Sequence, residues 1–287
     1  MRVPSTDGVE LEVHDLGGDG PDLLLAHATG LHGRVWEPFA SQLDGFHRWS
    51  IDFRAHGDSD PPLTRPLEWE GFADDVLATI DAVGMTRPVG VGHSMGAAAL
   101  LMAEARRPGT FRALWCFEPA VIPGDAPGAP HMDNPMSQGA LRRRPTFASP
   151  HDAVATFAAK PPFSGVPAET LERYVEHGFA PTADGAITLK CTPAAEAEVF
   201  AYGPASSAFA ALATVGCPVT IGVGDEATMP AAFCRDITAA LADGRLEQFD
   251  GLTHFGPLED HGRLSRSVRQ AFADLGDEHH PFRTAPR

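Results

Sequence analysis

The sequence has few basic residues, and only two of them, Lys160 and Lys190, are lysines. The 287-residue chain carries 22 Lys and Arg against 38 Asp and Glu, which gives a formal net charge of −16 at pH 7. A surface with this excess of negative charge repels nucleic-acid phosphates and anionic membranes. We therefore expect neither nucleic acid nor membrane as a partner.

Cysteine is also scarce, and the four cysteines show no Cys-x-x-Cys spacing: Cys116, Cys191, Cys217 and Cys234. This pattern favours buried reduced thiols over disulfides or a zinc site. No long apolar run occurs, since the best one, GAAALLMAEA, is short and contains Glu104. The N-terminus lacks the basic and apolar regions of a signal peptide. We expect a soluble, cytoplasmic protein that binds no metal.

Short apolar or alternating segments predict seven strands, at residues 9–16, 22–27, 47–52, 88–92, 112–118, 218–224 and 245–249. Helix-length segments lie between most of them, at residues 69–84, 95–106, 231–242 and 262–275. Strands that alternate with helices are typical of α/β proteins, in which helices cover both faces of a mostly parallel sheet.

The alternation stops between about residues 120 and 212, where proline and glycine cluster ahead of several helical stretches. Those stretches lie near 137–144, 150–160, 167–178 and 193–202. We interpret the region as a helical insertion above the sheet. The predicted division is a core of residues 1–121 and 213–276, a helical cap of residues 122–212, and a disordered tail of residues 277–287.

The stretch GHSMG places Ser94 between Gly92 and Gly96, where a predicted strand meets a predicted helix. This is the pattern of a nucleophile elbow, a turn so tight that only small residues fit two positions before and after the serine. The elbow would present the Ser94 hydroxyl at the edge of the sheet. The backbone N–H of Met95 would then point towards an oxyanion formed there.

A dinucleotide-binding turn is the rival interpretation, because Gly90 and Gly92 match the first two glycines of that fingerprint. Glu118 even lies at about the right distance in sequence for a ribose contact. Met95 occupies the position of the third glycine, however, and the turn is not the first βα turn of the chain. The nucleophile elbow is therefore favoured over a nicotinamide oxidoreductase.

A nucleophilic serine needs a histidine to accept its proton. His254, in GLTHFGPLED, follows the last predicted strand and has the position in chain order that such a histidine requires. A second oxyanion donor should lie after an early strand, and the Thr29 N–H in LLLAHATGLHG is the candidate. We expect the neighbouring His27 to brace this loop.

With these residues the chain resembles the α/β-hydrolase superfamily, in its lidded branch of esterases, lactonases and carbon-carbon bond hydrolases. The resemblance covers nearly the whole chain and depends on HATGLHGRVWEPFA, IDFRAHGDSD, GHSMG and GLTHFGPLE. It implies an eight-stranded, mostly parallel sheet, a helical cap after the sixth strand, and neither a metal nor an organic cofactor. Ala28 departs from the glycine that the family usually has after His27.

The carboxylate that would orient His254 has more than one candidate. The usual aspartate of the family would fall at Ala227, so that Asp225 or Glu226 could serve in a loop shorter by one residue. Glu118 is the alternative, and we favour it because a glutamate that ends an apolar strand against proline is costly unless it has a partner. Some relatives with a glutamate acid place it after that strand.

These residues predict a serine hydrolase of the carboxylic ester hydrolase type, which forms an acyl-enzyme on Ser94. The expected substrate is a small, largely apolar ester, lactone or related acyl compound, and the expected assembly is a monomer or homodimer. Cap aromatics could line the acyl pocket or form core: Phe147, Phe157, Phe163, Tyr174, Phe179, Phe200 and Tyr202. A ligand receptor on the same fold is the alternative, and a carbon-carbon bond hydrolase is less favoured.

Overall fold

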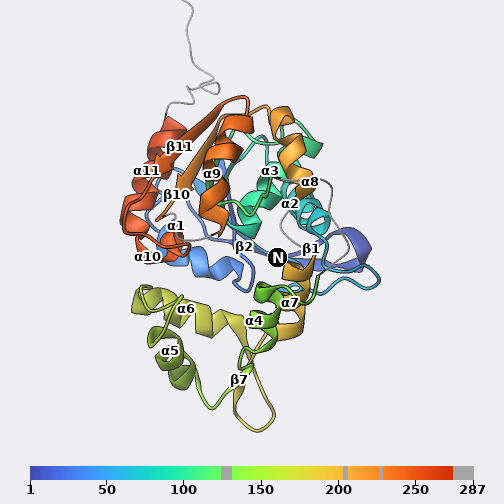
Figure 1. Cartoon of the computed structure of the whole chain (residues 1–287), viewed down its shortest axis with the longest axis vertical. Helices are drawn as coiled ribbons and strands as arrows, with labels where there is room; N and C mark the ends of the chain where they lie inside the picture. Colours follow the sequence, from blue (N-terminus) through green and yellow to red (C-terminus); the bar gives the residue numbers. More distant parts are fainter. Residues whose placement is uncertain (124–130, 203–205, 226–228, 274–287) are drawn as a thin grey trace, which may run out of the picture.

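An eight-stranded sheet forms the centre of the computed structural model, which describes residues 1–123, 131–202, 206–225 and 229–273 (Figure 1). The strand order is β1-β2-β4-β3-β5-β6-β10-β11. The only antiparallel pairs in it are β1 with β2 and β2 with β4. The strands are β1 (Arg2–Pro4), β2 (Glu10–Asp15), β3 (Asp22–Ala26), β4 (His47–Asp52), β5 (Val89–His93), β6 (Ala113–Phe117), β10 (Val219–Val223) and β11 (Gly244–Gln248). The predicted mostly parallel sheet is confirmed.

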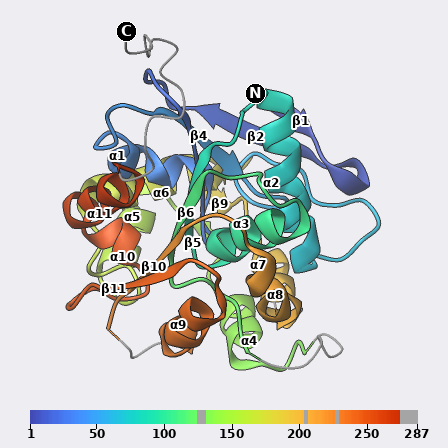
Figure 2. The ribbon, with the colours of Figure 1, turned by 90° about the horizontal axis from the view of Figure 1, so that it is seen from above.

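Helices cover both faces of this sheet, as the view from above shows (Figure 2). Alternate residues of β3 point to opposite faces. Leu24 packs on the side of α2 (Trp69–Val83), α3 (Met95–Arg106) and α9 (Met229–Ala240). Leu23 packs on the side of α1 (Glu37–Ala40) and α11 (His261–Ala273). The shorter elements of the core are η1 (Thr6–Gly8), η2 (Gly33–Trp36) and α10 (Gly256–Glu259).

Between β6 and β10 the chain forms an inserted helical region, the cap, which lies at one end of the molecule (Figure 1). The last part of the insertion, α8 (Ser206–Ala211) and η3 (Leu212–Thr214), instead packs against α3 of the core. The helices at the cap end are α4 (Pro135–Leu141), α5 (Pro150–Ala158), α6 (Ala168–Gly178) and α7 (Pro193–Ala201). Three of them begin with proline just after a residue whose side chain accepts a backbone N–H, the residues being Asn134, Ser149 and Thr192. Such caps satisfy N–H groups that have no acceptor inside the helix.

Four short strands were missing from the sequence prediction. One is β1, and the other three form a small sheet in the cap: β7 (Thr146–Phe147), β9 (Ile187–Leu189) and β8 (Phe179–Pro181). Segments of two or three residues are too short to show a period of two. The four cysteines are buried and form no disulfide. No helix among the described residues could span a membrane, and the predicted tail, 277–287, lies outside them.

Candidate active site

Ser94 occupies the turn between β5 and α3 with a backbone conformation that side chains rarely adopt. Its φ is 51° and its ψ is −111°. The N–H of Ser94 donates to the Phe117 carbonyl at 2.9 Å, and the Ser94 carbonyl accepts from the N–H groups of Ala98 at 3.0 Å and Ala120 at 3.1 Å. Backbone strain of this kind persists only where surrounding contacts hold it, and it is concentrated at functional sites.

The two flanking glycines are required by close backbone contacts. A Cβ atom at Gly96 would lie 2.3 Å from the Ala26 carbonyl oxygen and 2.6 Å from that of His27. A Cβ atom at Gly92 would lie 2.5 Å from the Cα of Ala97. The first turn of α3 therefore packs directly on the end of β3 and on the start of the loop that follows it.

Gly96→Ala is expected to lower the free energy of unfolding by about 1–3 kcal/mol, because the new methyl group meets rigid backbone atoms. Urea unfolding followed by circular dichroism measures the change. Gly139→Ala in α4 is the matched control, since a Cβ atom there meets nothing within 4 Å and should be neutral or slightly stabilising. Equal stability of the two variants would contradict the packing argument.

His254 and Glu118 meet at the same edge of the sheet although 136 positions separate them in sequence. Nδ1 of His254 lies 2.6 Å from Oε2 of Glu118. The other carboxylate oxygen, Oε1, accepts the N–H of Gly224 at 3.0 Å. Glu118 is fully buried and has a φ of 40°, whereas the His254 side chain is 21% exposed. A buried carboxylate thus orients the imidazole through Nδ1.

Asp225, another candidate carboxylate, bonds to a backbone group of the loop that carries His254. Asp225 is exposed, and its Oδ1 accepts the backbone N–H of Gly251 at 3.1 Å. It therefore stabilises the loop that carries His254 without contacting the imidazole. Glu226 lies outside the described residues.

The loop after β3 carries Thr29, the proposed second oxyanion donor, which is half-buried. His27 braces this loop: its Nδ1–H donates to the Ala28 carbonyl at 2.8 Å, and its Nε2 accepts the N–H of Phe53 at 3.1 Å. Burial lowers the pKa of His27 to about 3, so the ring is neutral at pH 7. Gly30, with a φ of 76°, completes the turn.

His93, the residue before Ser94, makes a contact that was not predicted from the sequence. Its Nε2 lies 2.7 Å from the backbone carbonyl of His254, and the two rings are 4.9 Å apart. Burial holds the pKa of His93 well below its ordinary value, so the neutral ring donates through Nε2–H. The elbow and the His254 loop are thereby joined directly. In the sequence, the position of His93 next to Ser94 was the signal that could have indicated this role.

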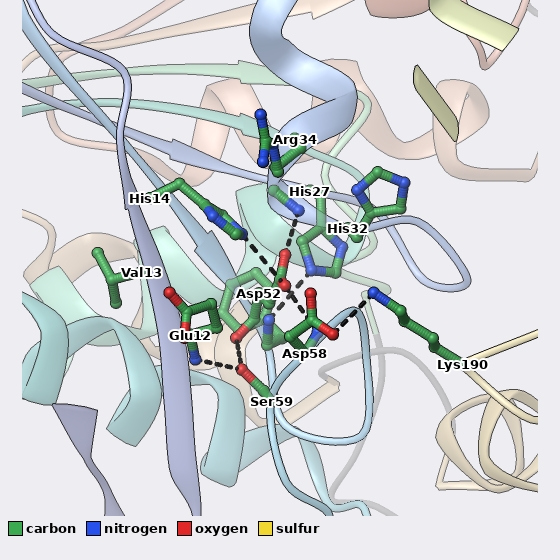
Figure 3. A network of polar contacts seen from close by, with 12 residues as sticks. Glu12, Val13, His14, His27, His32, Arg34, Asp52, Asp58, Ser59 and Lys190 are labelled. Carbon is green, nitrogen blue, oxygen red and sulfur yellow. Dashed lines mark hydrogen bonds and ion pairs between the residues drawn. The ribbon is translucent and has the colours of Figure 1, made fainter. Parts of the chain in front are cut away.

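The loop after β4 links the core to the cap (Figure 3). The Asp52 carboxylate accepts backbone N–H groups from Gly33 at 2.6 Å and Asp58 at 2.8 Å. Ser59 donates to the Asp52 carbonyl at 2.5 Å. The Asp58 carboxylate in turn accepts from Nζ of Lys190 in the cap at 2.7 Å. The predicted IDFRAHGDSD motif is therefore a largely buried scaffold whose exposed Asp58 contacts the cap.

The cap aromatics mainly pack against one another. Five of them form a cluster, with ring centroids 4.9–6.2 Å apart: Phe147, Phe157, Phe163, Tyr174 and Phe179. Phe163 also lies 5.1 Å from Phe255, the residue after His254. This cluster is the core of the cap, and Phe163 is the member that reaches the His254 loop.

A surface hollow of about 610 Å³ lies away from these residues, along β2, η2 and α1. Charged residues such as Arg34, Glu37 and Arg48 line it, and Arg34 is already paired with Glu37 at 2.5 Å. None of the residues discussed above around Ser94 and His254 lines this hollow. Within the described part of the chain, no cluster of three or more His, Cys, Asp or Glu could hold a metal ion.

Ser94 thus occupies a strand-to-helix turn, and His93 beside it joins that turn to the loop where His254 meets the buried Glu118. The sequence matches the alpha/beta hydrolase family over residues 23–266, and the chain belongs to that family. It is 29% identical to 2-(acetamidomethylene)succinate hydrolase of Mesorhizobium japonicum over 227 residues, which cover 78% of this chain and 77% of that protein. Lipase LipV of Mycobacterium tuberculosis is 32% identical over 114 residues, 39% of this chain and 43% of the lipase.

Solved structures show the same fold. The crystal structure of E-2-(acetamidomethylene)succinate hydrolase matches with a TM-score of 0.76 at 24% identity, covering 95% of this chain and 98% of the other. That of esterase RhEst1 from Rhodococcus sp. matches with a TM-score of 0.73 at 19% identity, covering 96% and 99%. The predicted α/β-hydrolase fold with an inserted helical region is confirmed.

Proposed function

We propose that the protein is a serine hydrolase that cleaves a small acyl substrate through a covalent intermediate on Ser94. The observation that carries this proposal is the 2.6 Å contact between Nδ1 of His254 and the buried Glu118, beside a serine in a strained strand-to-helix turn. The similar proteins, which include a lipase and an esterase by name, support hydrolysis as the class of reaction.

In the proposed reaction, the Ser94 oxygen attacks the acyl carbon while Nε2 of His254 accepts the hydroxyl proton. The backbone N–H groups of Met95 and Thr29 stabilise the oxyanion that forms. The imidazolium then gives the proton to the leaving group. In the second half, His254 takes a proton from water as the water oxygen attacks the acyl-enzyme, and it returns that proton to the Ser94 oxygen as the acid product leaves. Glu118 stabilises the imidazolium and keeps the proton of neutral His254 on Nδ1.

An ester is the acyl bond that we propose, and the reaction then belongs to carboxylic ester hydrolysis. The largely apolar substrate expected from the cap aromatics receives less support, because those rings are packed into the core of the cap. A small substrate agrees with the restricted access to the nucleophile, since Ser94 is only 9% exposed.

A fluorophosphonate probe tests the nucleophile. We expect one adduct per chain, located at Ser94 by peptide mass, and none in Ser94→Ala. His254→Ala should slow labelling at least about a hundredfold, because the hydroxyl loses its base. His131→Ala, which removes an exposed cap histidine, should label at the wild-type rate.

Labelling elsewhere, or none in the wild type, would refute the proposal. Turnover of 4-nitrophenyl acetate separates an enzyme from a single-turnover receptor. Many equivalents of nitrophenol per chain indicate catalysis, whereas release of one equivalent followed by arrest indicates a receptor.

A further inference from the structure

Arg143, which follows α4 in the cap, is a largely buried cation that sequence analysis did not single out. Its side chain is 21% exposed. Nη1 donates to a carboxylate oxygen of Glu196 in α7, and Nη2 donates to the Tyr174 hydroxyl in α6 at 2.8 Å. Contacts from two different helices therefore fix the position of the guanidinium, which reduces the entropy lost when it binds a ligand.

This guanidinium lies against the loop that carries the proposed oxyanion donor. A Cβ atom at Gly30 would be 2.8 Å from Oε1 of Glu196 and 3.2 Å from Nη1 of Arg143. Gly30 directly follows Thr29, so the ion pair packs one residue away from the N–H that would stabilise the oxyanion. In the proposed mechanism, a substrate whose carbonyl oxygen is bound by the Thr29 N–H would therefore lie near this cation.

Arg143 has more donors than its protein contacts use. A guanidinium carries five N–H groups, and the hydrogen bonds to Glu196 and Tyr174 occupy two of them. Among the described residues, no acceptor is found for Nε–H or for the second hydrogen on each of Nη1 and Nη2. The side chain is 21% exposed and no Arg143 nitrogen is both fully buried and without a partner, so these N–H groups remain accessible to a ligand.

We propose that Arg143 binds a carboxylate on the substrate, so that the enzyme prefers short acyl groups that end in a carboxylate. This inference rests on the proposed function and names the substrate class of that site. Arginine is suited to the role because its planar N–H groups match both oxygens of a carboxylate. Glu196 holds the guanidinium in place and partly offsets its charge, which limits the preference to a moderate size.

Two 4-nitrophenyl esters of nearly equal length test the preference, the hydrogen succinate and the butyrate. We expect wild-type kcat/KM to be at least about tenfold higher for the anionic succinate ester. Arg143→Met should lower the succinate-to-butyrate ratio by about 10- to 100-fold, the range expected for a lost charged hydrogen bond. Arg144→Met is the matched control: Arg144 is adjacent, 52% exposed and paired with Asp152, and its loss should leave the ratio unchanged.

Glu196→Gln provides a second variant, which should raise the ratio because it removes the competing carboxylate. A wild-type enzyme that prefers the butyrate, or a ratio that neither variant alters, would overturn the proposal. If neither ester is hydrolysed and Ser94 takes no fluorophosphonate label, the proposed function has failed instead. The carboxylate site is then tested by calorimetric titration with succinate, which should bind the wild type and not Arg143→Met; no binding to the wild type would refute it.

Discussion

Glu118→Gln is expected to lower kcat about ten thousand-fold while leaving the protein folded. The glutamine carbonyl can still accept the N–H of Gly224, which now bonds to Oε1. Its NH₂ group, however, would face Nδ1 of His254 and donate to it. The imidazole would then carry its proton on Nε2 and could no longer accept one from Ser94. An aspartate-to-asparagine change in a serine protease triad, which forces the same wrong tautomer, costs about ten thousand-fold in kcat.

Ester hydrolysis in the steady state, with circular dichroism to confirm the fold, measures this effect. Asp225→Asn is the matched control, since an asparagine carbonyl can still accept the Gly251 N–H, and we expect its kcat within about threefold of the wild type. Glu226→Gln belongs in the same series. A fully active Glu118→Gln variant, or an inactive Glu226→Gln variant, would indicate that the carboxylate that orients His254 lies in the loop after β10.

The sequence could not decide between these carboxylates for a physical reason. β6 and β10 are neighbouring parallel strands, so residues that follow either strand reach the same edge of the sheet. The choice depends on tertiary details: the φ of 40° at Glu118 and the Gly224 N–H that its carboxylate accepts. Neither leaves a pattern in a single sequence.

The core elements were predictable because their periodicity is strong. The predicted helix at 95–106 coincides with α3, and the predicted strand at 47–52 coincides with β4. The contacts of His93 and Arg143 were not predictable. His93 bonds to a backbone carbonyl 161 positions away, and Arg143 meets a loop that lies more than a hundred residues earlier. Such contacts arise from the packing of the cap and loops, which local patterns do not encode.

Stability is expected to fall steeply as the pH drops below about 6.5, because several histidines are buried in neutral form. His27, His32, His56 and His93 are at most 1% exposed. Burial lowers the pKa of His27 to about 3 and those of His32 and His56 to about 4, and it holds that of His93 well below its ordinary value. Below pH 6.5 the unfolded chain therefore binds protons that the folded chain does not.

The stability that these neutral histidines contribute is fully present above pH 6.5. It is lost as the pH falls towards 4 for His32 and His56 and towards 3 for His27. At pH 5.5 each of the four histidines should cost about 1 to 1.5 kcal/mol, which makes about 4 to 6 kcal/mol together. Asp52, whose pKa is lowered by His14 and nearby backbone N–H groups in spite of burial, contributes only at more acidic pH.

Urea unfolding between pH 8 and pH 5.5 measures this loss. His32→Gln should reduce the pH dependence by up to about a quarter, because it removes one of the histidines that stay neutral in the folded protein. A side-chain N–H remains for the Tyr174 carbonyl, which His32 now contacts at 3.1 Å. His151→Gln, at an exposed position in α5, should leave the pH dependence unchanged. A free energy of unfolding that stays constant from pH 7.5 to 5.5 would show that these histidines accept protons in the folded state, and that the neutral bracing of the oxyanion loop by His27 and of the His254 loop by His93 is wrong.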